Sequence, residues 1–259
     1  MRKIAIVMTY FNRKYQLDKT LLSLTKSNHK NFSVVIVDDA STDKLVIEKE
    51  YPFNIEVINI TPEEKTWTNP EPAYNRGILK ALELNPAIIM LQNAECYHND
   101  DVLLCTETEL NDTNYLSFAC FSLDEPTTFS DHALNDIVHS NNRCAVYNGE
   151  CAWYNHSEIR PVAYDFCSAI TVNNLKLLNG YDERFSSGNA YGDNYLLNRV
   201  KMLDLYIMII DYPFVVHQWH YNIPPHPDHP ALADKNLKLL DELTMKGDYR
   251  AVHLYTPDL

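Results

Sequence analysis

The chain has 259 residues and a mass of 30.0 kDa, with 46% hydrophobic and 22% charged residues, which is typical of one globular domain. Its 22 basic and 35 acidic side chains give a net charge of −13, so a nucleic-acid partner or an anionic membrane surface is not expected. No apolar run approaches the roughly 20 residues of a membrane span, and the glycine-rich phosphate loops of dehydrogenases and P-loop enzymes are missing.

Cysteine usage and the first residues give an expectation about the cellular compartment. No two cysteines have CxxC spacing, and a chain of this length can bury a core without disulfides. We expect several of them to be reduced, small buried side chains. The apolar run before Thr9 is too short for a signal peptide, so we expect a cytoplasmic protein.

The first half of the sequence alternates short apolar runs with amphipathic segments. Apolar runs rich in β-branched residues predict strands at Ile4–Met8, Val34–Val37, Ile55–Ile60, Ala87–Leu91 and Leu116–Leu123. Leucine spacing and an early proline predict helices over residues 15–25, 71–84 and 99–110. This alternation favours an α/β fold with an open, mostly parallel sheet, in which ligands bind outside the carboxyl ends of the strands.

The second half is less regular. Apolar spacing predicts helices over residues 192–205 and 231–245, a further helical stretch around 129–140, and a short strand at Phe214–Val216. Residues 151–164 are aromatic and polar and indicate a loop or short strands. The stretch 224–230 holds four prolines, and we expect either a lid or a stiff connection there.

Polar side chains follow several predicted strands and would meet at one edge of the sheet. Asp38 and Asp39 could accept hydrogen bonds from a base or ribose, or they could cap a turn. Glu95 could be an oxygen ligand of a divalent cation, or a surface glutamate. His217 and His220 could complete such a site, or they could pack beside Trp219.

Asp193 begins a predicted helix and would face the cleft. There it could act as a general base toward a bound hydroxyl, or it could cap the helix. The aromatic pair Trp153 and Tyr154 could form a platform for a sugar ring or could pack within the smaller lobe.

The order of these signals resembles that of the family 2 glycosyltransferases with the GT-A fold. The similar segments are, in chain order, Ile4–Arg13, Val34–Asp43 (a "VDDxSxD" element), Pro72–Gly77, Ile89–Glu95, Asn179–Phe185, Tyr191–Asn194 and Val215–His220. They extend over roughly residues 3–222. The resemblance implies one GT-A domain over 1–259, with a nucleotide-sugar half at 1–98, an acceptor half at 99–222 and a C-terminal loop and helix at 223–259.

The resemblance also implies residue roles. Donor contacts would come from Thr9, Tyr10, Asp38, Asp39, Asn75 and Asn93. Glu95, His217 and His220 would hold Mn²⁺ or Mg²⁺, and Asp193 would be the base of an inverting single displacement. The donor would be a nucleotide-diphosphate sugar, with a UDP-sugar as first choice. The acceptor would be a glycan or another hydroxyl compound, with Trp153, Tyr154 and Asp182 as candidate contacts.

Three departures from the family pattern keep alternatives open. The metal triplet is Asn93-Ala94-Glu95, with only one carboxylate. Tyr74 replaces an arginine of the family pattern, so a diphosphate contact would be lost unless Arg13 or Arg76 supplies it. Gly192 replaces the first acidic residue before Asp193. A non-catalytic module that binds nucleotide sugars is therefore the second hypothesis. A sugar-phosphate nucleotidyltransferase is a weaker third, because no glycine-rich loop follows Met8.

Overall fold

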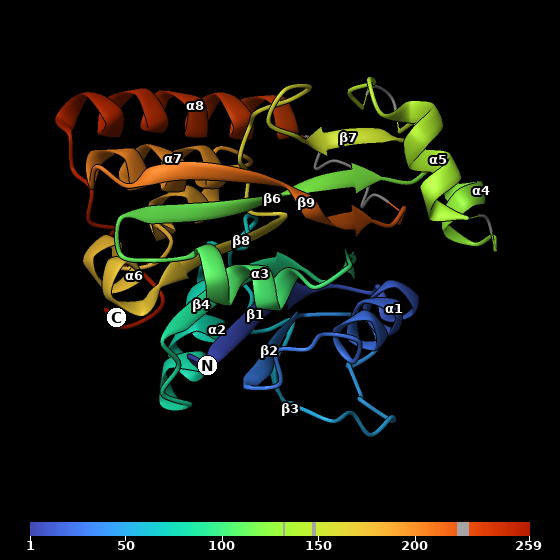
Figure 1. Ribbon diagram of the computed structural model, residues 1–259. Coiled ribbons are helices and arrows are strands. Elements are labelled where there is room, and N and C mark those ends of the chain that lie inside the picture. Colours follow the sequence, from blue (N-terminus) through green and yellow to red (C-terminus); the bar gives the residue numbers. More distant parts are fainter. Residues whose placement is uncertain (132, 147–148, 222–227) are drawn as a thin grey trace.

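The computed structural model describes residues 1–131, 133–146, 149–221 and 228–259. One nine-stranded sheet runs through the molecule, and helices cover both of its faces (Figure 1). The strand order is β3 (Asn54–Ile60), β2 (Phe32–Asp39), β1 (Ile4–Tyr10), β4 (Ile88–Asn93), β8 (Cys167–Thr171), β6 (Asn114–Ser122), β9 (Tyr206–His217), β5 (Cys96–Asn99), with β7 (Ala152–Asn155) on β6.

The longer strands of the sheet all run in the same direction, because β8 is antiparallel to both β4 and β6. Strands β3, β2, β1 and β4 are parallel, and β6 and β9 are also parallel to each other. The antiparallel pairs all involve β5, β7 or β8. The predicted open, mostly parallel α/β sheet is thus confirmed. The antiparallel strands are β5, β7 and β8, three short strands that the sequence pattern did not locate.

The two faces of the sheet pack against different helices because successive strand residues point to opposite sides. On one face, leucine and valine side chains of α1 (Lys14–Leu24), which lies against β5, and of α3 (Val102–Glu109), which lies against β6 and β9, share a buried cluster with Ile4 and Ile6 of β1. On the other face, α2 (Glu71–Glu83) packs against β1 and β2, and its apolar side chains share a second buried cluster with Ala5, Val7 and residues of α6 (Val172–Leu178) and α7 (Gly192–Met202). Both faces of the parallel half are therefore buried, as its unbroken apolar runs indicate.

Several predicted elements need correction. The helix expected from residue 99 starts at Val102, because β5 occupies Cys96–Asn99 and the Asp101 carboxylate caps the helix by accepting a hydrogen bond from the Leu104 N–H. The strand expected at 214–216 is the end of the longer β9. The helical stretch expected near 129–140 corresponds to α5 (Leu134–Asn141), whereas α4 (Glu125–Thr128) and the short helix η1 (Glu183–Ser187) were not predicted.

The C-terminal part of the chain agrees with the sequence prediction where the structure describes it. α8 (His229–Lys246) matches the predicted last helix, whereas residues 222–227, with most of the expected lid, lie outside the described residues.

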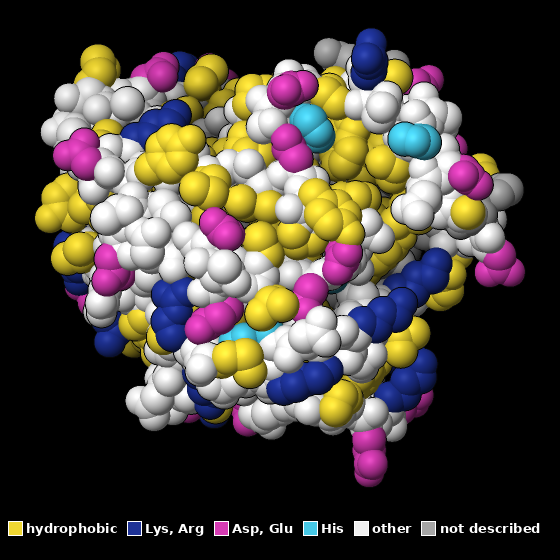
Figure 2. Space-filling view, viewed as in Figure 1, with side chains coloured by type: hydrophobic (Ala, Val, Ile, Leu, Met, Phe, Trp, Pro, Cys, Tyr) yellow, Lys and Arg dark blue, Asp and Glu magenta, His cyan; other side chains and the backbone are white. Residues whose placement is uncertain are grey.

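All six cysteines are free, and Cys144 is exposed rather than buried. On the face in Figure 2, basic side chains are scattered among acidic ones. Within the described ranges, no helix combines the length and apolar character needed to cross a bilayer.

Candidate active site

The carboxyl ends of three parallel strands bring the predicted polar residues to one edge of the sheet. In β1, Thr9 lies opposite Asn93 of β4, and Tyr10 lies opposite Asp38 of β2. Asn93 also accepts a hydrogen bond from the Tyr74 hydroxyl, at 3.2 Å between the oxygens. The expected gathering of these side chains is therefore present in the structure.

Asp38 and Asp39 are both buried and already have partners within the protein. The two carboxylate oxygens of Asp38 accept hydrogen bonds from the backbone N–H groups of Ser41 (3.0 Å) and Leu45 (2.8 Å). Asp39 pairs with Lys65 at 2.7 Å and accepts a hydrogen bond from the Trp67 indole N–H. These contacts match the turn-forming alternative for Asp38, and a donor contact of either residue stays a prediction.

Glu95, His217 and His220 converge beside this edge. The Nε2 atoms of His217 and His220 lie 3.3 and 3.4 Å from Glu95 Oε1, and the three ligand atoms are all within 4.8 Å of one another. Glu95 is 2% exposed, and within the described ranges its Oε2 has no hydrogen-bond partner. One carboxylate and two imidazoles suit a divalent transition-metal ion such as Mn²⁺, and the partnerless Oε2 leaves a further lone pair for it. The residues therefore fit the metal that the family resemblance implies.

Strand pairing explains how residues more than 120 positions apart meet here. β5 begins directly after Glu95, and its Cys96 is paired with His217 at the end of β9. Gln218 is fully buried and donates hydrogen bonds from its backbone N–H and its side-chain amide to the Glu95 carbonyl oxygen. These bonds fix the chain that carries both histidines against Glu95.

A guanidinium group also reaches this cluster. Arg13 Nη1 lies 2.7 Å from Glu95 Oε1. Burial by itself would raise the pKa of Glu95, but Arg13 and the hydrogen bonds from His217 and His220 outweigh it and hold that pKa well below its ordinary value. Glu95 is therefore ionised at neutral pH.

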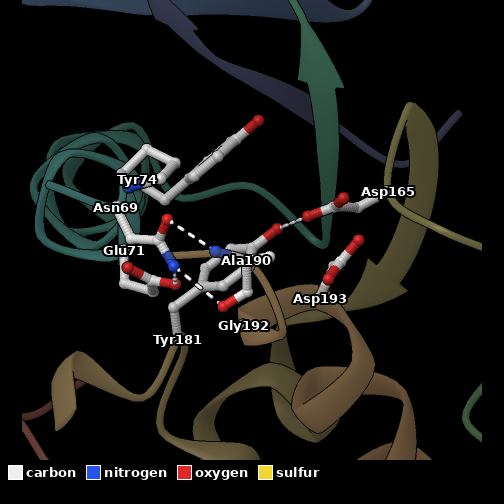
Figure 3. Close-up of a pocket in the computed structure, with 9 residues that line it drawn as sticks. Asn69, Glu71, Tyr74, Asp165, Tyr181, Ala190, Gly192 and Asp193 are labelled. Carbon is white, nitrogen blue, oxygen red and sulfur yellow. Dashed lines mark hydrogen bonds between the residues drawn. The ribbon is translucent and has the colours of Figure 1, made fainter. Parts of the chain in front are cut away.

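A second group of carboxyls surrounds a pocket of about 220 Å³ at the start of α7 (Figure 3). Asp193 is the second residue of α7, and Tyr191 is its N-cap residue, so the plain capping alternative for Asp193 is wrong. In Figure 3 the carboxyl groups of Asp165 and Asp193 lie beside each other, and the Tyr181 hydroxyl hydrogen-bonds to Asp165. Glu71 of α2 lines the opposite part of the pocket.

These carboxyls have pKa shifts opposite to that of Glu95. Burial raises the pKa of Glu71 to about 8, and the negative charges of Asp193 and Asp165 add to the increase. Burial and the neighbouring Asp193 raise the pKa of Asp165 to about 6. Burial also raises the pKa of Asp193. A carboxylate with a raised pKa is better suited to accept a proton at neutral pH.

Two adjacent residues connect the pocket to the cluster of Glu95, His217 and His220. Asp165 faces the pocket, while the ring of the next residue, Phe166, lies edge-on to His217 with the ring centres 6.1 Å apart. The Phe166 carbonyl accepts a hydrogen bond from the Asn93 N–H at 3.1 Å. The two groups of polar residues therefore flank the end of β4.

Several predicted site residues lie elsewhere. Asn75 is fully buried, and its amide bonds to Tyr181 and Glu183. Asp182 is buried and pairs with Arg184 at 2.6 Å. These positions do not support the predicted donor contact of Asn75 or the predicted acceptor contact of Asp182.

The two predicted acceptor aromatics also differ from each other. Trp153 packs edge-on to Phe121 and Phe214, which matches the packing alternative. Tyr154 contacts His217, with ring centres 5.2 Å apart.

Glu71 and Asp165 were not predicted, because a first-turn glutamate and an isolated aspartate carry no distinctive spacing.

Comparison with known proteins decides the family. The family described as Glycosyl transferase family 2 matches residues 5–141, more than half of the chain. The chain belongs to this family. An "Uncharacterized glycosyltransferase" of Haemophilus influenzae is 30% identical over 94 residues, which is 36% of this chain and 30% of that relative. The chain thus matches less than a third of that protein's length.

Solved structures show the same fold. The S. aureus TarS 1–349 structure in complex with UDP-GlcNAc matches 98% of this chain and 68% of that chain, with a TM-score of 0.66 and 13% identity. The mannosyltransferase PcManGT from Pyrobaculum calidifontis, in complex with GDP-Man and Mn²⁺, matches 97% of this chain and 66% of that chain, with a TM-score of 0.53 and 14% identity. The expected GT-A-type fold is confirmed.

Proposed function

We propose that this family 2 protein is a metal-assisted, inverting glycosyltransferase that moves a sugar from a nucleotide-diphosphate sugar to an acceptor hydroxyl. The observation that carries the proposal is the convergence of Glu95, His217 and His220 at the carboxyl edge of the parallel strands. Structures of the same fold hold UDP-GlcNAc in one case and GDP-Man with Mn²⁺ in another, which supports a nucleotide-sugar donor, with a UDP-sugar as first candidate.

Glu95, His217 and His220 would hold Mn²⁺ or Mg²⁺, which when bound neutralises negative charge on a diphosphate leaving group. Thr9, Tyr10 and Asn93 border the place where the donor would lie. We retain the division into a nucleotide-sugar half (1–98) and an acceptor half (99–222) as part of the proposal. The pocket takes residues from both, including Glu71 and Asp193.

Asp193 is the proposed base. As the acceptor oxygen attacks the anomeric carbon, Asp193 takes the hydroxyl proton, the new C–O bond forms, and the bond to the nucleotide diphosphate breaks with its electron pair. The raised pKa of Asp193 and its position on the pocket wall support this role.

One contact favours a second candidate, a non-catalytic nucleotide-sugar-binding module. Arg13 pairs with the same Glu95 oxygen that both histidines approach, and a guanidinium there competes with a metal ion. Such a module would bind the donor but would neither transfer nor hydrolyse it in Mn²⁺.

Calorimetry with UDP, GDP, CMP and dTDP and their common sugars, in Mn²⁺, in Mg²⁺ and in EDTA, tests the proposal. We expect a UDP-type ligand to bind in Mn²⁺ and to lose affinity in EDTA. Binding that is indifferent to metal would remove the roles of Glu95 and the histidines. No nucleotide binding would contradict the proposal as a whole. Binding in Mn²⁺ without any turnover would favour the second candidate.

A further inference from the structure

The pocket at the start of α7 is held in shape by contacts within the protein. The Asn69 side chain exchanges two hydrogen bonds with the backbone of Ala190, with Nδ2 to the carbonyl oxygen at 3.0 Å and the N–H to Oδ1 at 3.1 Å. The rings of Tyr74 and Tyr181 stack with their centres 4.8 Å apart, and Tyr181 also bonds to Asp165 (Figure 3). Its walls are therefore fixed by contacts from α2, the loop before α7, and residues 165 and 181.

Glu71 has an oxygen that the protein leaves without a partner. Its side chain is 3% exposed, its Oε1 accepts a hydrogen bond from Asn69 at 3.2 Å, and within the described ranges its buried Oε2 has none. A buried carboxyl oxygen without a partner costs free energy, which a ligand that supplies a hydrogen-bond donor would offset. The carboxyl fits here because residue 192 is glycine: a Cβ at that position would lie 2.1 Å from Glu71 Oε1.

The chemical character of the lining selects among ligands. Nine of the described residues line the pocket; they include three carboxyls, two phenols and one amide, and none of these nine is lysine, arginine or histidine. The described lining therefore offers many acceptors for N–H and O–H groups and no positive charge for an anion. Its volume of about 220 Å³ is below the 300–1,000 Å³ of pockets for drug-sized ligands, which favours a single ring.

We propose that this pocket receives the acceptor, and that the acceptor group entering it is a neutral or amine-bearing polyol ring, such as a sugar without phosphate or carboxylate substituents. This inference rests on the proposed function, because Asp193 lies on the same wall and would meet the reacting hydroxyl there. Asp165 and Glu71 are its binding residues. Asp165 opposes a negative substituent by charge repulsion, and Glu71 accepts or donates a hydrogen bond to a ring hydroxyl.

Three methyl glycosides that differ mainly in charge test the inference: methyl glucoside, methyl glucosaminide and methyl glucuronide. Their dissociation constants are measured by ligand-observed NMR with the full chain in Mg²⁺ and UDP. We expect the glucoside and the glucosaminide to bind at least about tenfold more tightly than the glucuronide. Comparable or tighter binding of the glucuronide, or binding of none of the three, would overturn the inference.

Two variants and one control locate the effect. We expect Asp165→Asn to shrink the discrimination against the glucuronide and Glu71→Ala to weaken the glucoside about fivefold. Glu50→Gln, on an exposed segment, should change neither value. If Asp165→Asn leaves the discrimination against the glucuronide unchanged and Glu71→Ala leaves the affinity for the glucoside unchanged, the ring binds elsewhere. Calorimetry of UDP on the same samples separates the two proposals, because nucleotide binding without ring binding overturns only this one.

Discussion

Glu95 and Glu71 are both buried glutamates near the carboxyl edge of the sheet, yet their surroundings are opposite. Glu95 lies 2.7 Å from a guanidinium and within 3.4 Å of two imidazoles, and its pKa is well below its ordinary value. Glu71 has two other carboxyls nearby and no basic residue among the described residues of its pocket, and its pKa is raised to about 8.

The difference shows how neighbours and not residue type assign chemistry to a carboxyl. A carboxylate surrounded by positive and imidazole groups stays ionised and is suited to a cation. A carboxyl among other carboxyls holds a proton more readily and is suited to hydroxyl chemistry. In the proposed transfer reaction, the donor side of the site would require the first environment, and the acceptor side would require the second.

The change with the largest expected effect removes the proposed base. We expect Asp193→Asn to lower transferase turnover by about 100- to 10,000-fold, because the amide cannot accept the hydroxyl proton, while nucleotide affinity stays nearly unchanged. Release of UDP from a UDP-sugar in the presence of acceptor measures it. Asp165→Asn, the matched change at the neighbouring carboxyl, should cost less turnover. Full activity of Asp193→Asn would end the assignment.

The next change tests Glu95 as the proposed cation ligand. Glu95→Gln removes the only negative charge among the described ligand atoms, and we expect UDP affinity in Mn²⁺ to fall at least about tenfold, toward its value in EDTA. The thermal shift that UDP and Mn²⁺ produce together provides the measurement. Glu107→Gln, which also breaks a glutamate–arginine pair but far from the site, is the control. A Mn²⁺ effect that survives in Glu95→Gln would exclude Glu95 as a ligand.

The pocket carboxyls predict how stability varies with pH. The folded pKa of Glu71 is raised, so the folded state binds more protons than the unfolded chain between about pH 4 and pH 8, and the unfolding free energy falls as pH rises through this range. One such group contributes a slope of at most about 1.4 kcal/mol per pH unit. Denaturant unfolding across this range should show a shallower slope for Glu71→Gln than for the parent or Glu50→Gln. Equal slopes would contradict the raised pKa.

The smallest expected effect concerns Gly192. Gly192→Ala places a Cβ against the Glu71 carboxyl, which must then move away from Asn69, at an expected cost of about 1 kcal/mol in unfolding free energy. Combined with Glu71→Ala, the same substitution should cost less than it does alone. Strictly additive effects in this cycle would show that Glu71 does not fill that space.

The strand-end geometry could be predicted from the sequence because it depends on local patterns. Apolar runs at Ile4–Met8 and Ala87–Leu91 mark parallel strands, whose carboxyl ends must meet, so the neighbourhood of Thr9 and Asn93 follows from topology. The late histidines could be matched to Glu95 only through the family's order of motifs. Their actual contact depends on β5, a four-residue strand too short to recognise by periodicity.

The pocket at the start of α7 could not be predicted in the same way. Asp165 lies in an irregular segment, and its importance comes from the tertiary contact with Tyr181 and the proximity of Asp193. Glu71 has the usual appearance of a first-turn helix acid, and only the fold reveals that Gly192 leaves room for it. Long-range packing, which no spacing encodes, placed both.

The contrast between Glu95 and Glu71 is most directly measured by carboxyl-carbon NMR of glutamate-labelled protein over a pH titration, with Glu95→Gln and Glu71→Gln used to assign the two signals. We expect the Glu71 signal to titrate near pH 8 and the Glu95 signal to stay that of an ionised carboxylate through the pH range in which an ordinary glutamate titrates, in metal-free buffer. Two signals that titrate together near the ordinary glutamate pKa would contradict the account.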